Sequence, residues 1–250
     1  MNADAGHSQS RPPLELNGVR IGYGSTFQLS DVTTRSMPGD VVGLIGPNGS
    51  GKSTLLKAIA GVLKPSEGEI LLGNQPIRER ASEVAFVPQR EEVNWDFPVT
   101  ALDVVLMGRY RSVGWLRRPG SADRAAAERA LDRMGLGGLG VRHISQFSGG
   151  QQQRIFLARA IVQEPRLILL DEPFTGIDQE NREILHEAIR EFAASGVITM
   201  MATHDLDEVQ ATCTHVLCLN KRVVAFGPTS TTFTEPILRQ TFGGRVAVFA

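Results

Sequence analysis

Residues 46–53 read GPNGSGKS and fit the pattern G-x-x-x-x-G-K-[ST]. The apolar run VVGLIG, residues 41–46, leads directly into them. After them, Leu55, Ile59 and Val62 recur at the spacing of one helix face. A buried strand, a glycine-rich loop and a helix in this order predict an α/β fold with a phosphate-binding loop at the end of a strand.

The chemistry of this loop follows from its glycines and its lysine. Glycines adopt backbone conformations that turn successive N–H groups towards one point, and the following helix adds partial positive charge there. We expect Lys52 to reach the β- and γ-phosphates of a nucleotide, Ser53 to ligate Mg²⁺ and Thr54 to contact the α-phosphate. A glycine-rich turn with a solvated lysine is the alternative, which the flanking strand and helix disfavour. The residues expected at the nucleotide are Gly46, Pro47, Asn48, Gly49, Ser50, Gly51, Lys52, Ser53 and Thr54.

A second anchor for Mg²⁺ is predicted at the end of the apolar run LILL, residues 167–170. Asp171 follows this run at the C-terminal end of a strand, where ligands bind in open α/β sheets. Glu172 comes next, and we expect it beside the γ-phosphate, where a carboxylate can orient or deprotonate an attacking water. The alternative is an acidic pair that caps a helix after a core strand. The phosphate loop elsewhere in the chain favours the metal site.

Length and composition bound the class of protein. The chain has 250 residues, 42% of them hydrophobic, and a net charge of −1. These values predict one folded domain with no general attraction for nucleic acid, so no nucleic-acid partner is expected. Two cysteines suit a reducing compartment. We expect no signal peptide, because residues 1–13 have no apolar stretch, and no membrane span, because no apolar run reaches about 20 residues. We expect a mobile tail at residues 1–13 and a single domain at residues 14–250.

The order of the remaining patterns predicts the layers of the domain. Strand-like segments precede the phosphate loop, and helical patterns dominate from Thr100 to Val162. Two buried strands follow, RLILLDEP at 166–173 and VITMMAT at 197–203, with an amphipathic helix between them. This alternation predicts parallel pairing with crossover connections. The segment VLCLNKRVVAFG, residues 216–227, predicts a terminal hairpin.

A second anion-binding pattern lies 95 residues after Lys52. FSGGQQQR, residues 147–154, opens a predicted helix with a serine and two glycines, whose hydroxyl and free N–H groups suit a γ-phosphate. Because the first loop already holds the chain's own nucleotide, the nucleotide of a second chain is the expected ligand. With this motif the chain, from about residue 14 to 245, resembles the nucleotide-binding subunits of ATP-binding cassette (ABC) transporters, whose signature is usually LSGGQ. Phe147 replaces the leucine, and the matching positions are Ser148, Gly149, Gly150 and Gln151.

The resemblance implies roles for four further positions. Tyr23 stands where the family places the aromatic residue that stacks on adenine, and Gln89 where it places the glutamine that senses Mg²⁺ and the attacking water. Asp178 ends the motif TGID, residues 175–178, in the loop that crosses the dimer interface; the family more often has SALD there. His204, in ATHD, occupies the position of the switch histidine that contacts the γ-phosphate. The implied catalytic residues are Lys52, Gln89, Glu172 and His204, and the implied metal site comprises Ser53, Gln89 and Asp171.

The resemblance also implies a fold class and a mechanism. The fold is a P-loop NTPase core with a mixed, mainly parallel sheet, an N-terminal antiparallel β lobe and an inserted α-helical lobe at about residues 95–162. Two copies of the chain close head to tail around two molecules of MgATP, each held by the phosphate loop of one copy and the signature helix of the other. Hydrolysis opens this homodimer and drives a separate integral-membrane permease, served by an extracytoplasmic substrate-binding protein. The chain is then peripheral, at the cytoplasmic face of the membrane.

Residues 90–119 are similar to the corresponding segment of cassettes that serve manganese, zinc or iron uptake permeases. This resemblance implies import of a divalent metal ion without specifying which; import of another substrate, such as an iron chelate, is the alternative within the transporter class. We expect the permease to dock around residues 89–111. The exposed candidates are Trp95, Asp96, Phe97 and Tyr110, and ordinary packing within the helical lobe is the alternative for the aromatic ones.

Two other protein classes are disfavoured. A DNA-associated cassette ATPase carries a long coiled coil between the phosphate loop and the signature, whereas only 94 residues separate Lys52 from Phe147 here and none of them form heptads. A cassette that binds ATP without turnover is disfavoured by the presence of Glu172 and His204.

The segment CTHVLC, residues 213–218, invites a zinc interpretation. Alternation along a strand would place Cys213 and His215 on one face and Cys218 on the other, and a structural zinc site needs four converging ligands. We therefore expect two small buried residues at Cys213 and Cys218.

Overall fold

The protein is described by a computed structural model that covers residues 11–23, 26–93, 95–114 and 118–244. Its central layer is a six-stranded sheet in the order β10-β9-β3-β8-β7-β6. The inner strands pair in parallel, and only β10 runs antiparallel to its neighbour β9. The parallel pairing predicted from the buried apolar runs and the terminal hairpin are therefore confirmed. The strands are β3 (Val41–Ile45), β6 (Val84–Val87), β7 (Leu167–Asp171), β8 (Ile198–Ala202), β9 (His215–Leu219) and β10 (Val223–Pro228).

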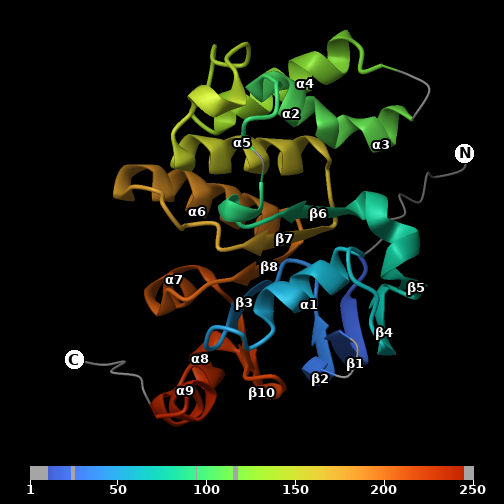
Figure 1. The fold of residues 1–250 in the computed structure, drawn as a ribbon, viewed down its shortest axis with the longest axis vertical. Coiled ribbons are helices and arrows are strands. Elements are labelled where there is room, and N and C mark those ends of the chain that lie inside the picture. Colours follow the sequence, from blue (N-terminus) through green and yellow to red (C-terminus); the bar gives the residue numbers. More distant parts are fainter. Residues whose placement is uncertain (1–10, 24–25, 94, 115–117, 245–250) are drawn as a thin grey trace, which may run out of the picture.

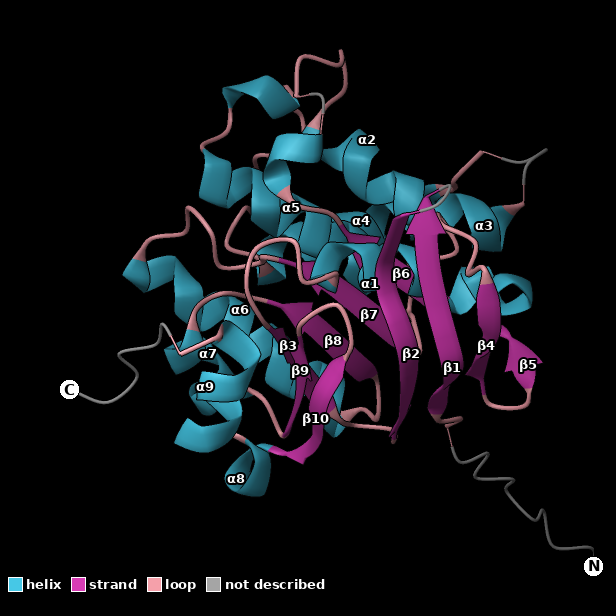
Figure 2. Ribbon diagram, turned by 60° about the horizontal axis from the view of Figure 1, so that its bottom comes forward, coloured by secondary structure: helices cyan, strands magenta, loops and turns pink. Residues whose placement is uncertain are grey.

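A second, antiparallel sheet has the order β2-β1-β4-β5. Helix α1 (Lys52–Ile59) contacts strands of both sheets, and Figure 2 shows it between β1 and β2 on one side and the central sheet on the other. One apolar core fills the space between the two sheets around this helix. This arrangement places the first turn of α1 at the carboxyl end of β3. The strands are β1 (Leu14–Tyr23), β2 (Thr26–Ser36), β4 (Glu67–Leu72) and β5 (Gln75–Pro76).

A helical layer covers the other face of the central sheet and forms the second apolar core with it. Figure 1 shows α2, α3 and α4 in green at the end of the molecule opposite β1 and β2, with α5 between them and the central sheet. The inserted α-helical lobe that the resemblance implied is thus seen directly. Its elements are α2 (Ala101–Leu106), η3 (Met107–Arg109), α3 (Tyr110–Val113), α4 (Ser121–Arg133), η4 (Ile144–Gln146) and α5 (Gly149–Val162).

The remaining helices lie outside the helical lobe. α6 joins β7 to β8 as the predicted crossover, α7 joins β8 to β9, and α8 and α9 pack against the final hairpin. None of the helices among the described residues is long and apolar enough to cross a membrane. These elements are α6 (Gln179–Ala194), α7 (Leu206–Thr212), α8 (Thr229–Thr232), α9 (Glu235–Phe242), η1 (Ile77–Glu83) and η2 (Arg90–Glu92).

Two details differ from the expectations. α1 ends at Ile59, and Val62, predicted on the same helix face as Leu55 and Ile59, is 64% exposed because the chain turns at Gly61 with φ +75°. Cys213 does not share a strand with His215, since it follows α7 and precedes β9. Its thiol is nevertheless buried, as is that of Cys218, so the expectation of two buried cysteines is confirmed.

The predicted N-terminal tail lies largely outside the described residues. Its last residues contact the domain: the carbonyl of Pro13 accepts a hydrogen bond of 2.7 Å from the N–H of Gly73. Of the tail, residues 1–10 stay a prediction.

Candidate active site

The glycine-rich loop is held in a shape that its first residue makes possible. Gly46 has φ +154°, and a Cβ atom there would lie 2.0 Å from the carbonyl oxygen of Leu219. A side chain at this position would therefore collide with the backbone of β9. Gly51 has φ +103° and is the N-cap of α1, so the loop enters the helix through a conformation that other residues rarely adopt.

Lys52 is largely buried inside this loop, with 8% of its surface exposed. Its Nζ donates hydrogen bonds to the carbonyl oxygens of Gly46, at 2.8 Å, and Pro47, at 3.3 Å. Burial lowers the pKa of the ammonium, and the carboxylates of Glu172 and Asp171 act in the opposite direction. The loop therefore concentrates a desolvated positive charge next to backbone N–H groups, which suits a phosphate.

Asp171 lies at the end of β7 and is 1% exposed. Its Oδ1 accepts a hydrogen bond of 3.1 Å from the hydroxyl of Ser53, whereas its buried Oδ2 has no hydrogen-bond partner among the described residues. Burial is the largest cause that raises the pKa of this carboxyl group, and the hydrogen bond from Ser53 opposes it. A buried carboxylate with a free oxygen beside a serine hydroxyl is a donor set that fits Mg²⁺.

Glu172 has φ +51°, a left-handed conformation that costs a residue other than glycine about 1 kcal/mol or more. Its N–H donates to the carbonyl of Ala202 at 2.9 Å, which ties the turn to the end of β8. One carboxylate oxygen, Oε1, lies 3.5 Å from Nδ1 of His204, and the other, Oε2, accepts a hydrogen bond of 3.1 Å from the hydroxyl of Thr175. The turn thus fixes both oxygens of a carboxylate at the carboxyl edge of the sheet.

The residues described above surround a cleft of about 620 Å³. It gathers residues from the glycine-rich loop, the segment after β6, the turn after β7 and the turn after β8. Glu172 and His204 face the loop across this cleft, and Asp171 borders it through its contact with Ser53. The lining residues are Asn48, Gly49, Ser50, Gly51, Lys52, Ser53, Thr54, Gln89, Glu172 and His204.

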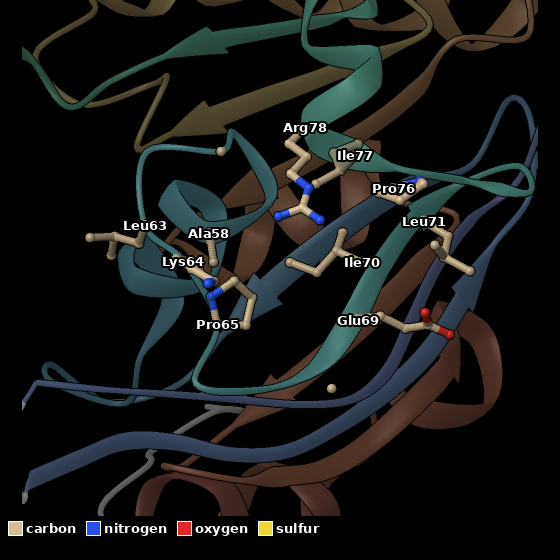
Figure 3. A pocket seen from close by; sticks show the side chains of 12 residues that line it. Ala58, Leu63, Lys64, Pro65, Glu69, Ile70, Leu71, Pro76, Ile77 and Arg78 are labelled. Carbon is tan, nitrogen blue, oxygen red and sulfur yellow. The ribbon is translucent and has the colours of Figure 1, made fainter.

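Another pocket, of about 500 Å³, lies at the opposite end of α1 (Figure 3). It is bounded by Ala58 and Leu63 on one side and by Ile70 and Ile77 on the other, and Figure 3 shows Arg78 extending over Ile70. None of the predicted site residues lines it, and all three of its charged side chains are exposed. The chemistry of the predicted site therefore belongs to the cleft at the N-terminus of α1.

The signature residues lie at the start of α5, outside this cleft. Ser148 is the N-cap of α5, and its Oγ and the side chain of Gln151 form a capping box with each other's backbone N–H groups. None of Ser148, Gly149, Gly150 and Gln151 lines the cleft described above. Asp178 is likewise an N-cap, of α6, and its Oδ1 accepts a hydrogen bond of 3.0 Å from the N–H of Asn181.

The structure describes the side chain of Trp95 but not that of Tyr23. The backbone of Tyr23 ends β1, but its side chain lies outside the described residues, so its predicted contact with adenine stays a prediction. Trp95 packs within the helical lobe: its Nε1 donates to the carbonyl of Arg90 at 2.9 Å, and its ring meets that of Phe156 edge-on at 5.1 Å. The exposed docking candidates are therefore Asp96, Phe97 and Tyr110.

Sequence reasoning missed two residues that contact predicted site residues, Thr175 and Arg90. Thr175 was noted only as a departure from the usual motif, yet its hydroxyl holds Glu172. Arg90 follows Gln89, and its Nε donates to Oε1 of Gln152 on α5 at 3.1 Å while its side chain covers Gly149. The spacing of three residues between Glu172 and Thr175 is a signal for the first contact. No local pattern indicates the second, because it joins residues 62 positions apart.

The fold and the cleft together define a nucleotide-binding P-loop protein, and comparison with known proteins narrows this class. The ABC transporter family matches residues 29–175. The zinc transport system ATP-binding protein TroB of Treponema pallidum is 42% identical over 94% of this chain and 88% of its own length. The manganese transport system ATP-binding protein MntB of Bacillus subtilis is 41% identical over 94% of each.

Solved structures that resemble this chain include an ABC transporter and an ATP-binding cassette. An inward-facing ABC transporter of the metal-chelate type matches with a TM-score of 0.81 and 31% identity, over 94% of this chain and 90% of that one. A dimeric post-hydrolysis cassette bound to ADP and phosphate matches with a TM-score of 0.74 and 27% identity, over 86% and 98%. The chain belongs to the ABC transporter family, as an ATP-binding subunit that hydrolyses ATP.

Proposed function

We propose that the cleft at the N-terminus of α1 binds MgATP and hydrolyses it. The observation that carries this proposal is the meeting of four separate chain segments there: the glycine-rich loop, Gln89, Glu172 and His204. The loop amides and the ammonium of Lys52 would hold the β- and γ-phosphates, with Thr54 at the α-phosphate and Tyr23 at the base. Ser53, Asp171 and Gln89 would hold Mg²⁺, whose charge neutralises the phosphate oxygens when it is bound.

Glu172 is the group proposed to act on water. Its carboxylate is held by Thr175 and lies near His204, so it is oriented before any substrate arrives. In this position it would orient the attacking water and accept its proton, while His204 would contact the γ-phosphate. Gln89, at the cleft wall, would contact both the metal site and the water. Hydrolysis breaks the bond between the β- and γ-phosphates, and inorganic phosphate and ADP leave.

A second copy of the chain is proposed to complete each site. Ser148 and the amides of Gly149 and Gly150 begin α5, a helix of 14 residues, and they do not line the chain's own cleft. A helix start of this length, led by a serine and two glycines, suits an anion. We infer that it contacts the γ-phosphate held by a second copy, with Asp178 at the interface between the copies. The dimeric cassette with ADP and phosphate supports this arrangement.

The partner of this homodimer would be a separate integral-membrane permease. Phe97 and Tyr110 are large apolar side chains on the helical lobe that are 56% and 50% exposed, as expected of residues at a protein interface. We propose that they form part of the docking surface, which would hold the subunit at the cytoplasmic face of the membrane. An extracytoplasmic substrate-binding protein would deliver the substrate to the permease, and this chain would not contact the substrate.

The transported substrate is proposed to be a divalent metal ion, imported as Mn²⁺, Zn²⁺ or iron. The names of the two relatives support a free ion, and the metal-chelate transporter supports a chelate as the second candidate. ATPase activity of the subunit reconstituted with its permease and binding protein in vesicles distinguishes these candidates. Stimulation by one free cation supports ion import, whereas stimulation only by an iron chelate supports the second candidate.

The proposed chemistry is tested by Glu172→Gln, which keeps the size and the acceptor oxygen of the side chain. We expect this variant to bind ATP, to form a dimer in the presence of MgATP and to hydrolyse ATP at least about 100-fold more slowly. Thr175→Val, which removes the hydroxyl that holds the carboxylate, serves as a milder companion with a smaller loss of rate. Turnover at the original rate in Glu172→Gln would remove Glu172 from its proposed role.

A further inference from the structure

A network of charged side chains joins the first turns of α6 and α7. Arg182 lies on α6, and its Nη1 is 2.6 Å from Oε1 of Glu208 and 3.4 Å from Oδ2 of Asp205. Glu208 is 6% exposed, so its charge depends on partners within the protein. His186, one turn further along α6, lies 3.1 Å from the other oxygen of Glu208. Figures 1 and 2 show the two helices side by side.

One end of this network leads to His204. Asp205 directly follows His204 and is the N-cap of α7, where its Oδ1 accepts hydrogen bonds from the N–H groups of Asp207, at 3.1 Å, and Glu208, at 3.3 Å. The same carboxylate is paired with Arg182 through its other oxygen. Arg182 therefore constrains the turn from which His204 projects into the cleft.

The other end leads to the loop before α6. Nε of Arg182 donates to the carbonyl of Ile177 at 3.5 Å, and Ile177 immediately precedes Asp178. The same stretch packs on the signature helix, because a Cβ atom at Gly150 would lie 3.5 Å from the carbonyl oxygen of Gly176 and 3.6 Å from Cα of Ile177. A single guanidinium thus contacts both the loop proposed to lie at the dimer interface and the turn that carries the histidine of the chain's own cleft.

We propose that Arg182 is a positioning residue that transmits the position of the 175–178 loop to His204. The planar guanidinium has five donors in a fixed geometry, so it can hold the Ile177 carbonyl and the Asp205 carboxylate at one relative position. A displacement of the loop when a second copy docks would then displace the turn before α7. This inference rests on the proposed function, and it adds a specific residue through which docking of one copy adjusts the cleft of the other.

Arg182→Ala removes this contact without touching the phosphate loop. We expect its kcat for ATP to fall by about tenfold, while the Kd for MgATP changes by less than twofold, because the ligands of the phosphates are intact. Arg182→Lys should recover only part of the rate, since one ammonium can neutralise Glu208 but does not reproduce the fork that spans two partners. Arg190→Ala is the matched control: Arg190 lies on the same helix, is exposed and pairs with Glu183 instead.

The decisive measurement is whether the effect of Arg182→Ala on hydrolysis depends on the presence of His204. If Arg182 acts through this histidine, single-turnover hydrolysis in His204→Ala should fall by less than twofold on adding Arg182→Ala, against about tenfold in the unmodified background. A tenfold loss in both backgrounds would overturn the inference, as would a rate in Arg182→Ala equal to that of Arg190→Ala. A kcat that falls together with a weakened Kd would also overturn it, because it would indicate a general loss of structure.

Two additional variants keep the test decisive. Should Arg182→Ala fail to fold, because Glu208 is left charged and buried, the double variant Arg182→Met with Glu208→Gln removes both charges and takes its place. The inference predicts that this folded double variant remains about tenfold slow, and a normal rate would overturn it. Glu172→Gln is measured in parallel: normal hydrolysis there contradicts the proposed function, whereas slow hydrolysis there with a normal rate in Arg182→Ala contradicts only the role of Arg182.

Discussion

Oε1 of Glu172 lies 3.5 Å from Nδ1 of His204, although the two residues follow different strands, β7 and β8, and stand 32 positions apart in the chain. The pairing of β7 with β8 brings them together, because Asp171 is in register with Ala202. Both side chains therefore lie at the carboxyl edge of the central sheet, where they line the cleft.

His204→Ala is expected to slow hydrolysis by about 100-fold with little change in ATP affinity. The side chain is 64% exposed and contributes one contact to Glu172, so its loss should not disturb the fold. Its proposed contact with the γ-phosphate matters most when negative charge develops there. Steady-state hydrolysis and nucleotide titration measure the two effects, and a weakened affinity with an unchanged kcat would contradict this role.

Gly46→Ala should destabilise the protein by about 3 kcal/mol, because the added Cβ would overlap the carbonyl of Leu219. Gly61→Ala is the control: Gly61 also has a positive φ, of +75°, but nothing lies within 4 Å of its Cβ position, so we expect a loss of about 1 kcal/mol from backbone strain alone. Chemical denaturation in the absence of nucleotide measures both. Equal losses of stability in the two variants would show that the overlap with the backbone of β9 does not add to the cost.

Ser148→Ala and Thr100→Ala each remove a capping box, of α5 and α2 respectively. Both should cost about 1 kcal/mol of stability. Only Ser148→Ala should also lose MgATP-dependent dimerisation, since only this cap is proposed to contact the nucleotide of a second copy. Light scattering with MgATP in the Glu172→Gln background compares the two. Equal dimerisation of both variants would contradict the proposed contact.

Asp171→Asn should raise the stability of the nucleotide-free protein at pH 7 and abolish the effect of Mg²⁺ on nucleotide binding. The pKa of Asp171 is raised mainly by burial, so the folded protein disfavours the charged form and stability is lost as pH rises through the folded pKa. The amide keeps an acceptor for Ser53 and has no charge. We expect a gain of about 1 kcal/mol, or about 2 to 4 °C in the unfolding midpoint, which shrinks as pH falls towards 4. A loss of stability at pH 7 would contradict this.

The two cysteines predict a specific pH dependence. Burial raises the pKa of the Cys213 thiol from 9.0 to about 12 and that of Cys218 to about 11. The folded protein therefore holds these protons more tightly than the unfolded chain, and their stabilising contribution is complete below pH 9 and is lost as pH rises through 11 and 12. Both thiols should resist a thiol reagent at pH 8 and react after unfolding. Replacing both with alanine should flatten the alkaline decline in stability, and rapid labelling of the folded protein would contradict the burial argument.

The local pattern was sufficient to predict the phosphate loop, the strand that ends at Asp171 and the helix that begins after Ser148. Each of these depends on neighbours within a few positions: glycines that permit a tight loop, an apolar run that favours a buried strand, a serine that caps a helix. Gln89, Asp178 and His204 came from the resemblance to the family. Their local surroundings are those of ordinary loop and capping residues, so spacing by itself does not distinguish them.

What the sequence by itself determined is the list of chemical groups and the class of site: a phosphate loop, an acidic pair after a buried strand and a second anion-binding helix start. What only the tertiary structure decided is which of these groups share one cleft and which side chains hold them. Glu172 meets His204, Arg90 covers Gly149, and Arg182 spans Ile177 and Asp205. Most of these contacts depend on which strands are neighbours in the sheet and on how helices pack over it. That order is set by burial of the whole core and not by any local period, so the pairs meet only in the folded chain.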